Sequence, residues 1–435
     1  MYEKWRLAIG TVPDDVLDEA KNSTGFSFSY EGTGSSEGKK RLARGSTDLA
    51  GSDSALSAAE KNATPGVWFV PALAGAIAIG YNLPATLGLN DTDPHKSLKI
   101  PRELLARIFL GQVKEWRELA EWNPSLANVT AKISVIVRSD GSGTTSVLTE
   151  ALTKFSQDWA SKVGTSSLPK WPQNLTAYKG EGNAGAARQI LIHEYALGYL
   201  SLSDAVSWQV PVALVSNKAG VFSYPTVEAV KAAMGETAIR MQQEAAKGSR
   251  VFFSSIVDPS GQDAYPIATL TYLAFDEARL VNTIGGCQTL FDITYLLHWI
   301  LTNDRASVIA SESYFCPLSA AMKDAMLVLL SKLAPKTCGK RPILDDVIAK
   351  SIPPPACNPG EMRQLFNEST EARLKVRQCT RCDPGFFSSS GLASRCSSCL
   401  PGYFQARPQP TAPIVDPSFH VPHLERFAGR LYRGS

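Results

Sequence analysis

A short polar segment, RSDGSGTT at residues 138–145, joins a β-branched run to a stretch with helical apolar spacing. The first N–H groups of a helix have no partner within the helix, and the helix dipole adds partial positive charge there. Two glycines let the backbone approach a ligand closely, and Arg138 adds a planar cationic fork. The segment therefore predicts a strand-to-helix turn that holds an anion. The alternative is an ordinary turn in which Ser142 or Thr144 only caps the helix.

Two upstream turns carry related chemistry. Ser35 lies in GTGSS after the alternating residues FSFSY, and it either donates to an anion or serves only as an N-cap. The glycines there are one residue off the dinucleotide fingerprint, and no acidic residue follows at the ribose position, so we expect no Rossmann site. Asp53 lies in TDLAGSDSALS. A carboxylate beside anion donors suits an anion that carries a proton, whereas a lone Asp is otherwise a solvated turn residue.

The elements that must position these turns alternate between strands and helices. The run GVWFVPALAGAIAIGY predicts core strands interrupted by Pro71 and Gly75, and residues 135–137 predict another buried strand. A fourth turn, GEGNAG around Asn183, is interpreted as a tight turn for close packing. The helix after the anion turn is predicted from apolar residues at helical spacing, namely Val147, Leu148, Ala151, Leu152 and Phe155.

The composition is that of an ordinary globular chain, with 44% hydrophobic and 20% charged residues. Its 435 residues suffice for two or three domains, each with its own core. The net charge of +3 indicates no strong affinity for nucleic acid or for a membrane surface. No apolar run reaches about 18 residues, so we expect no span of a bilayer. The start, MYEKWRLAIG, lacks the order of a signal peptide.

Taken in order, these motifs resemble the phosphate-binding protein family of bacterial phosphate ABC transporters. The resemblance covers roughly residues 2–335 and is carried by YEGTGSSEGKKRLA, TDLAGSDSALS, FVPALAGAIAIGYN, IFLGQVKEW, VIVRSDGSGTTSVLTEAL, KGEGNAGAA and DAYPIATLTYLAF. It implies an α/β class II periplasmic-binding-protein fold, whose two lobes close on a ligand. Lobe one is expected at residues 1–76 and 267–335, and lobe two at residues 77–266. The implied function is non-enzymatic binding of inorganic phosphate, with no cofactor, metal or catalytic residue.

The resemblance also assigns roles to single residues. Asp53 matches the family's proton-accepting carboxylate, and Asp140 matches the residue that fixes the arginine. The matching phosphate donors are Ser35, Arg138, Ser142, Gly143 and Thr144.

Two features depart from the family. Glu37 stands where the family commonly has glycine, and it either points inward and weakens binding or lies on the solvated side. The start MYEKWRLAI matches the helix after the family's first donor loop. We therefore expect the family's first strand and its Thr-Phe loop to be absent from this sequence.

Cysteine is confined to residues 287–435, since the first 286 residues contain none and eight follow. Residues 336–378 are expected to form a linker with a disulfide between Cys338 and Cys357. Residues 379–404 repeat the unit C-x-x-C-x-x-G-aromatic-Phe and resemble ephrin-receptor-like and tumour-necrosis-factor-receptor-like disulfide modules, with zinc-ribbon spacing as the alternative. The expected disulfide cysteines there are Cys379, Cys382, Cys396 and Cys399. The proline-rich residues 405–435 are expected to be disordered.

Six N-x-[ST] sequons and the cysteine-rich segment indicate an extracellular or cell-surface glycoprotein. The expected acceptors are Asn22, Asn62, Asn90, Asn128, Asn174 and Asn367. One alternative function is a fragment of a receptor ectodomain that senses phosphate or another oxyanion, attached to a membrane only through segments absent from this chain. Another is a phosphatase, which is disfavoured because His95, His193 and His298 each stand alone in the sequence.

Overall fold

The computed structural model describes residues 31–351, except 91, 92, 94, 95, 176, 236 and 340, and six short strands beyond them. The chain divides into two compact units, Met1–Val347 and Ile348–Ser435. The strand expected at residues 26–30 lies outside the described residues. None of the described helices combines the length and apolar character needed to cross a bilayer.

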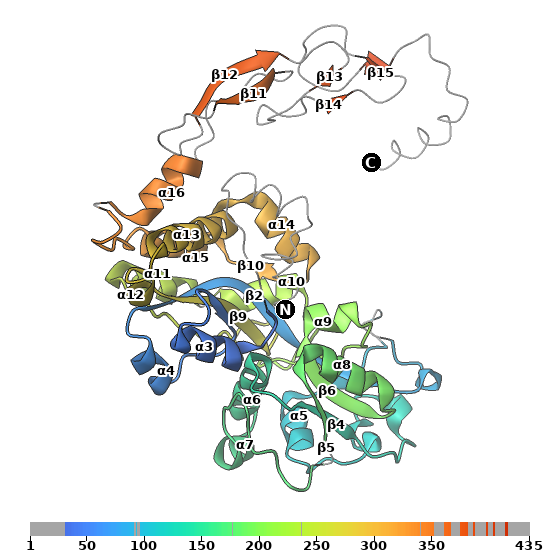
Figure 1. Cartoon of the computed structure of the whole chain (residues 1–435). Coiled ribbons are helices and arrows are strands. Elements are labelled where there is room, and N and C mark those ends of the chain that lie inside the picture. The colour runs from blue at the N-terminus through green and yellow to red at the C-terminus, as the bar shows by residue number, and fades with distance from the viewer. Residues whose placement is uncertain are drawn as a thin grey trace. The chain divides into compact units, whose positions relative to one another are not determined.

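One long strand, β2 (Val67–Asn82), connects two halves of the first unit (Figure 1). Its first part, to Ala76, pairs antiparallel with β9 (Ala268–Asp276), and its second part, from Ile77, pairs antiparallel with β6 (Ala196–Ser201). Because β2 changes partner between Ala76 and Ile77, we keep the lobe boundaries expected from the sequence as our proposal.

The core strands expected from the apolar run form this single strand, which is buried from Val67 to Tyr81. Pro71 does not end it. The register shifts between Pro71 and Leu73, so the residue that lacks an N–H group lies at a bulge, where the loss of a ladder hydrogen bond is tolerated. A single hydrophobic cluster then extends from Leu42 in one half to Trp159 in the other.

The strands of the main sheet run in the order β1-β9-β2-β6-β4-β5, and β10 also pairs with β2. The pairs β4–β6 and β4–β5 are parallel, so the C-terminal end of β4 opens into a crossover to a helix. The remaining strands of this sheet are β1 (Ala50–Ser52), β4 (Ser134–Arg138), β5 (Ala177–Gly180) and β10 (Cys316–Pro317). A smaller sheet contains β3 (Lys99–Ile100), β7 (Leu214–Ser216) and β8 (Phe222–Ser223).

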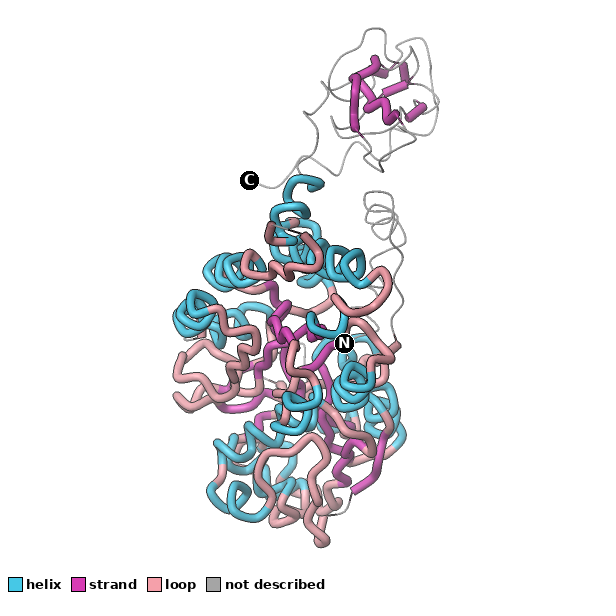
Figure 2. Tube along the Cα trace, turned by 60° about the vertical axis from the view of Figure 1, so that its left-hand side comes forward, coloured by secondary structure: helices cyan, strands magenta, loops and turns pink. Residues whose placement is uncertain are grey.

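Helices lie on both sides of these strands (Figure 2). The expected helix after β4 is confirmed as α6, and all five of its apolar residues predicted from helical spacing are buried. The helices of the first unit that bear on the site are α3 (Ser35–Arg44), α4 (Ala58–Ala63), α6 (Gly143–Phe155) and α8 (Gly182–Ile192). The others are α5 (Arg102–Phe109), α7 (Gln157–Lys162), α9 (Leu202–Ser207), α10 (Val227–Met234), α11 (Ala238–Lys247), α12 (Glu277–Leu280), α13 (Gly286–Thr302), α14 (Asp304–Glu312), α15 (Ala320–Leu330) and α16 (Ile343–Ser351), with 3-10 turns at Ala85–Leu87, Trp116–Leu119 and Pro124–Leu126.

The disulfide expected between Cys338 and Cys357 is wrong. Cys338 bonds to Cys287 near the start of α13, and their Cα atoms are 5.3 Å apart. The sequence separation of 51 residues concealed this pairing, because α13, α14 and α15 fold back between the two cysteines. Cys316 is buried and free, and burial raises the pKa of its thiol to about 11.

The second unit contains three described strand pairs. They are β11 (Glu361–Phe366) with β12 (Lys375–Arg381), β13 (Phe386–Phe387) with β14 (Ser397–Ser398), and β15 (Tyr403–Phe404) with β16 (Ile414–Val415). The side chains of the expected disulfide or zinc cysteines, and Cys357, lie outside the described residues, as do residues 405–435 apart from β16. Their bonding stays a prediction.

Candidate anion-binding site

The turn after β4 leads directly into the N-terminus of α6, as the sequence predicts. Ser142 is the N-cap residue, and its Oγ accepts a hydrogen bond from the N–H of Thr145 at 3.3 Å. The Ser142 N–H donates to the Ser167 carbonyl at 2.9 Å, which fixes the approach to the helix. Gly143 and Thr144 open the helix, so their N–H groups have no intrahelical acceptor. The turn therefore presents backbone donors at the positive end of a 13-residue helix.

A second set of residues comes from the other half of the unit. Gly34 precedes α3 with φ of 79°, a conformation that favours glycine, and Ser35 begins the helix. The Asp53 N–H donates to Ser35 Oγ at 3.3 Å. Thr271 Oγ1 donates to Asp53 Oδ1 at 2.8 Å, because β1 and β9 are neighbours in the sheet. Ser35 is thus held next to a buried carboxylate.

The two sets meet at Gly143. A Cβ atom on this residue would collide with Ser35 Oγ and would lie 3.0 Å from Asp53 Cβ and 3.1 Å from Asp53 Oδ2. Only glycine permits this approach. The structure therefore brings together all six expected ligand residues, and each is buried, namely Ser35, Asp53, Arg138, Ser142, Gly143 and Thr144.

Arg138, at the end of β4, is 6% exposed and held by several hydrogen bonds. Its Nε donates to Asp140 Oδ1 at 2.8 Å, its Nη2 donates to Asp140 Oδ2, and its Nη1 donates to Asn183 Oδ1 at 2.6 Å. The Gly182 N–H also donates to Asp140 Oδ1, at 3.0 Å. These hydrogen bonds therefore fix the orientation of the planar guanidinium group.

The two carboxylates differ in protonation behaviour. Burial raises the pKa of Asp53 to about 6, against the opposing effects of the Thr271 hydrogen bond and the Arg138 charge. Partial burial also disfavours charge on Asp140, but the hydrogen bonds and charge of Arg138, with the Gly182 N–H, lower the pKa of that carboxyl overall. Asp140 therefore neutralises Arg138, and Asp53 places a negative charge among the donors at neutral pH.

Three further residues hold the site, and the sequence did not identify them. Asn183 accepts from Arg138 and, at 3.5 Å, from Thr144 Oγ1, so the turn interpreted as close packing also fixes the arginine. Tyr199 OH accepts from the Arg138 N–H at 3.2 Å, and burial raises its pKa to about 12, so it stays neutral. The third is Thr271 on β9. Of these three residues, only Asn183 lies in a motif that the sequence analysis singled out, the glycine-rich turn GEGNAG.

Glu37 lies on the solvated side of α3. Its Oε1 is 3.5 Å from Arg41 Nε and 4.0 Å from Arg44 Nη1, and its side chain is 39% exposed. The inward alternative is therefore wrong, because two arginines one and two turns along the helix attract this carboxylate.

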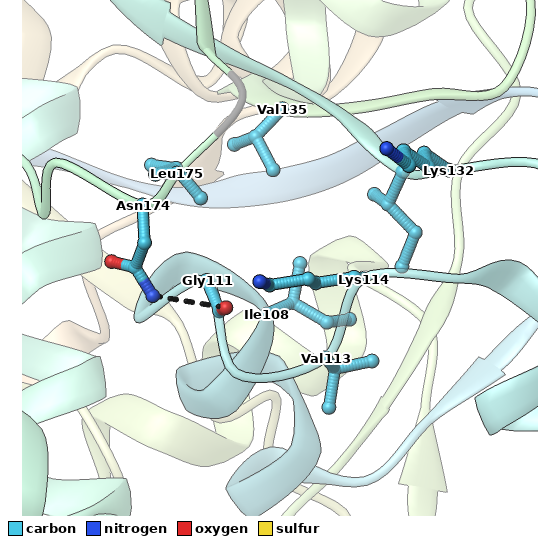
Figure 3. A pocket seen from close by; sticks show the side chains of 9 residues that line it. Ile108, Gly111, Val113, Lys114, Lys132, Val135, Asn174 and Leu175 are labelled. Carbon is cyan, nitrogen blue, oxygen red and sulfur yellow. Dashed lines mark hydrogen bonds between the residues drawn. The ribbon is translucent and has the colours of Figure 1, made fainter.

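A separate pocket of about 110 Å³ lies at the other end of β4 (Figure 3). Lys114, Asn174 and Val135 are among the residues that line it. Arg138 ends β4 three residues after Val135, and none of the expected ligand residues lines this pocket. It is therefore distinct from the candidate anion site.

Four of the expected glycosylation acceptors are exposed, namely Asn62, Asn90, Asn128 and Asn174. The Asn174 Nδ2 donates to the Gly111 carbonyl at 3.1 Å, so this amide is engaged in the fold. Asn22 and Asn367 lie outside the described residues. Glycosylation stays a prediction.

Two comparisons concern the kinds of protein in which this domain occurs. The chain is 27% identical over 272 residues to the putative serine/threonine-protein kinase/receptor R818 of Acanthamoeba polyphaga mimivirus, covering 58% of this chain and 15% of that protein. The structure also resembles that of a solved phosphate-binding protein from Stenotrophomonas maltophilia, with 22% sequence identity and a TM-score of 0.53. The match covers 69% of this chain and 86% of that protein's chain. At this identity the likeness concerns the fold, and the expected two-lobed α/β periplasmic-binding-protein fold is confirmed.

The family follows from the sequence comparisons. Residues 8–285 match the model of the PBP superfamily domain. The chain is 33% identical over 301 residues to the phosphate-binding protein PstS of Methanocaldococcus jannaschii, covering 67% of this chain and 75% of that protein. The chain therefore belongs to the PBP superfamily and, within it, to the family of the phosphate-binding protein PstS.

Proposed function

We propose that this protein binds inorganic phosphate between its two lobes and releases it unchanged. Membership of the PstS family supports the ligand. One observation carries the proposal. The buried carboxylate of Asp53 lies next to Gly143, in the first turn of α6, and the buried Arg138 ends the strand before that turn. A carboxylate in such a position repels an anion unless that anion brings a proton to share.

The proposed donors have hydrogen-bonding capacity to spare. Within the described residues, three of the five guanidinium N–H groups of Arg138 donate, to Asp140 and Asn183, and two are left for a ligand. The N–H groups of Gly143 and Thr144 point out of the first turn of α6. Ser35 Oγ accepts from Asp53 and Ser142 Oγ accepts from Thr145, so each hydroxyl proton is available to donate.

Asp53 is proposed to separate phosphate from sulfate. Phosphate retains at least one proton at neutral pH and can donate it to Asp53 Oδ2, whereas sulfate has none. An unprotonated sulfate oxygen at the same place faces a like charge in a buried, low-dielectric site. The selectivity therefore comes from a repulsive contact.

Calorimetric titration of the phosphate-depleted 435-residue protein with phosphate and with sulfate tests this function. At about pH 8 we expect phosphate to bind and sulfate to bind at least about tenfold more weakly, because sulfate binds only after the Asp53 carboxyl, whose pKa is about 6, takes up a proton. Failure to bind phosphate, or equal affinity for sulfate, would contradict the proposal.

The proposal includes the absence of catalysis. Within the described residues, no group of three His, Cys, Asp or Glu side chains could hold a metal ion. His193 Nδ1 contacts the Gln189 carbonyl at 2.9 Å, and burial lowers the pKa of His298. Release of phosphate from a chromogenic phosphate ester, at a rate above that of an Arg138→Ala variant, would favour the phosphatase alternative.

The cellular setting is proposed to be extracellular or at a cell surface. The Cys287–Cys338 disulfide is typical of an oxidising compartment. The exposed sequons suit a glycoprotein, and the residue 379–404 repeats suit an ephrin-receptor-like disulfide module. Loss of mass on treatment with an N-glycanase, abolished when all six acceptor asparagines are replaced by glutamine, would support this setting.

A receptor ectodomain is the second candidate function. The similarity to the putative serine/threonine-protein kinase/receptor R818 supports it, as does the cysteine-rich segment that follows the binding domain. Phosphate binding is common to both candidates. A protein that stays in the membrane fraction until detergent is added would favour the receptor. Recovery of the protein in the culture medium would favour the free binding protein.

A further inference from the structure

A buried lysine holds the turn that carries Asp53. Lys39, in α3, is 6% exposed. Its Nζ donates to the Ala55 carbonyl at 2.8 Å and to Ser54 Oγ at 3.1 Å, and it lies 3.3 Å from Glu60 Oε2 in α4. The three oxygens account for all three protons of the ammonium group. Burial lowers the pKa of Lys39, and the charge and hydrogen bond of Glu60 oppose this effect.

The contacts of α3 bracket Asp53 on both sides. Ser35 and Lys39 are four residues apart and project from the same face of the helix. Ser35 Oγ accepts from the Asp53 N–H, while Lys39 donates to the two residues that follow Asp53. Ser52 Oγ closes the turn internally, because it donates to the Ser54 carbonyl at 2.9 Å and accepts from the Ser54 N–H at 3.1 Å.

A buried ammonium group is costly, and stability alone does not explain it. Replacing a buried ion pair by apolar side chains of similar volume is often neutral or stabilising. A buried lysine here is therefore explained better by a need to hold the Asp53 turn in one position. Phosphate selectivity needs the Asp53 carboxylate in a fixed position relative to Ser35 before the ligand arrives, since ordering a loop on binding lowers affinity.

We propose that Lys39 is a positioning residue that fixes the Asp53 turn against α3 and so sets the affinity for phosphate and its discrimination from sulfate. This inference rests on the proposed function. Lys39 does not contact the ligand in this scheme. It acts through Ser54 and Ala55 on the carboxylate that does.

The test compares Lys39→Met with Lys40→Met in calorimetric titrations of the whole chain with phosphate and sulfate. Lys40 is the adjacent, exposed lysine, so its variant has the same net charge and the same helix. For Lys39→Met we expect phosphate affinity to fall about tenfold or more and the phosphate-to-sulfate ratio to narrow. For Lys40→Met we expect both quantities to stay within about twofold of wild type.

The outcomes separate this inference from the proposed function. If wild type does not bind phosphate, both are wrong. If wild type binds and Lys39→Met retains the wild-type affinity and ratio, even at a lower melting temperature, Lys39 is only structural and the inference is overturned. If Lys39→Met does not fold, Ser54→Ala decides, because it removes one acceptor without exposing a charge; an unchanged ratio there overturns the inference, and a loss of about threefold in affinity with a narrower ratio supports it.

Discussion

Gly143 and Asp53 lie in contact across the two halves of the binding unit. A Cβ on Gly143 would be 3.1 Å from Asp53 Oδ2 and would collide with Ser35 Oγ. The N-terminus of α6 can therefore reach the turn after β1 only because residue 143 has no side chain. The contact between the two halves and the proposed anion site therefore use the same atoms.

The first prediction follows from this contact. Gly143→Ala is expected to weaken phosphate binding at least about tenfold, because the added methyl group holds Ser35 and Asp53 away from the helix terminus. Titration calorimetry measures the effect. Gly235→Ala is the matched control, since Gly235 has helical backbone angles and its added Cβ would come no closer than 3.4 Å to any neighbour. Equal affinities for the two variants would show that Gly143 does not limit the site.

A second prediction concerns Arg138. Arg138→Ala is expected to weaken phosphate binding at least about 100-fold, or about 2.7 kcal/mol, because a charge-assisted donor is lost and Asp140 is left without its cation. Arg138→Lys keeps the charge but loses the fork that donates to Asp140 and Asn183, and we expect it to lose at least about tenfold. An Arg138→Ala affinity within a few-fold of wild type would remove this residue from the site.

Local signals predicted much of this fold. The helical spacing of apolar residues predicted α6, and the apolar run predicted buried strands at β2. The run did not predict that a single strand passes through both Pro71 and Gly75, because that continuity depends on pairing with β9. The pairing of Cys287 with Cys338 could not be predicted either, because three helices bring the two cysteines together. Cysteine spacing does not determine a disulfide when the intervening chain folds back.

In the candidate site, too, local sequence predicted some residues, whereas others depend on contacts between distant segments. Turns rich in glycine and hydroxyl residues predicted where these groups would lie, since Arg138 ends a strand, Ser142 caps a helix and Ser35 opens one. The residues that hold these groups gave weaker signals or none. Thr271 is 218 residues from Asp53, in a fully buried strand, and its hydrogen bond depends on strand order in the sheet.

A third prediction concerns the cysteine-rich segment. Cys379, Cys382, Cys396 and Cys399 are expected to be disulfide-bonded, because a module this small cannot bury enough apolar surface without bridges. Mass spectrometry of alkylated, non-reduced protein should find Cys316 as the free thiol within the described residues and none among these four. Stoichiometric zinc, with all four thiols reactive after chelation, would establish the zinc-ribbon alternative instead.

A fourth prediction tests the role of Asp53. Asp53→Asn keeps the shape, removes the charge and adds a donor, so sulfate should bind far better and the phosphate-to-sulfate ratio should fall at least about tenfold. Asp48→Asn is the control, because Asp48 is 60% exposed and the same chemical change there should leave the ratio unaltered. Competition between the two anions at fixed pH and salt measures it. A ratio that survives Asp53→Asn would make Asp53 an ordinary turn residue.

The last prediction is a pH dependence of selectivity. Burial raises the pKa of Asp53 to about 6, so the carboxyl is charged at about pH 8 and gains a proton as the pH falls towards about 5. The charged form only accepts hydrogen bonds and repels sulfate, whereas the protonated form can donate to a sulfate oxygen. Bound sulfate favours the proton further, because the anion stabilises the neutral acid, so the transition should move upward in its presence. In wild type we therefore expect sulfate affinity to rise, and the phosphate-to-sulfate affinity ratio to fall at least about tenfold, as the pH is lowered from 8 to 5. Asp53→Asn has no proton to gain at this position, so its ratio should lack this transition. If the phosphate-to-sulfate ratio changes with pH in the same way in both proteins, the change in ratio comes from the ligands or from another group. The Asp53 carboxylate then does not discriminate between these anions.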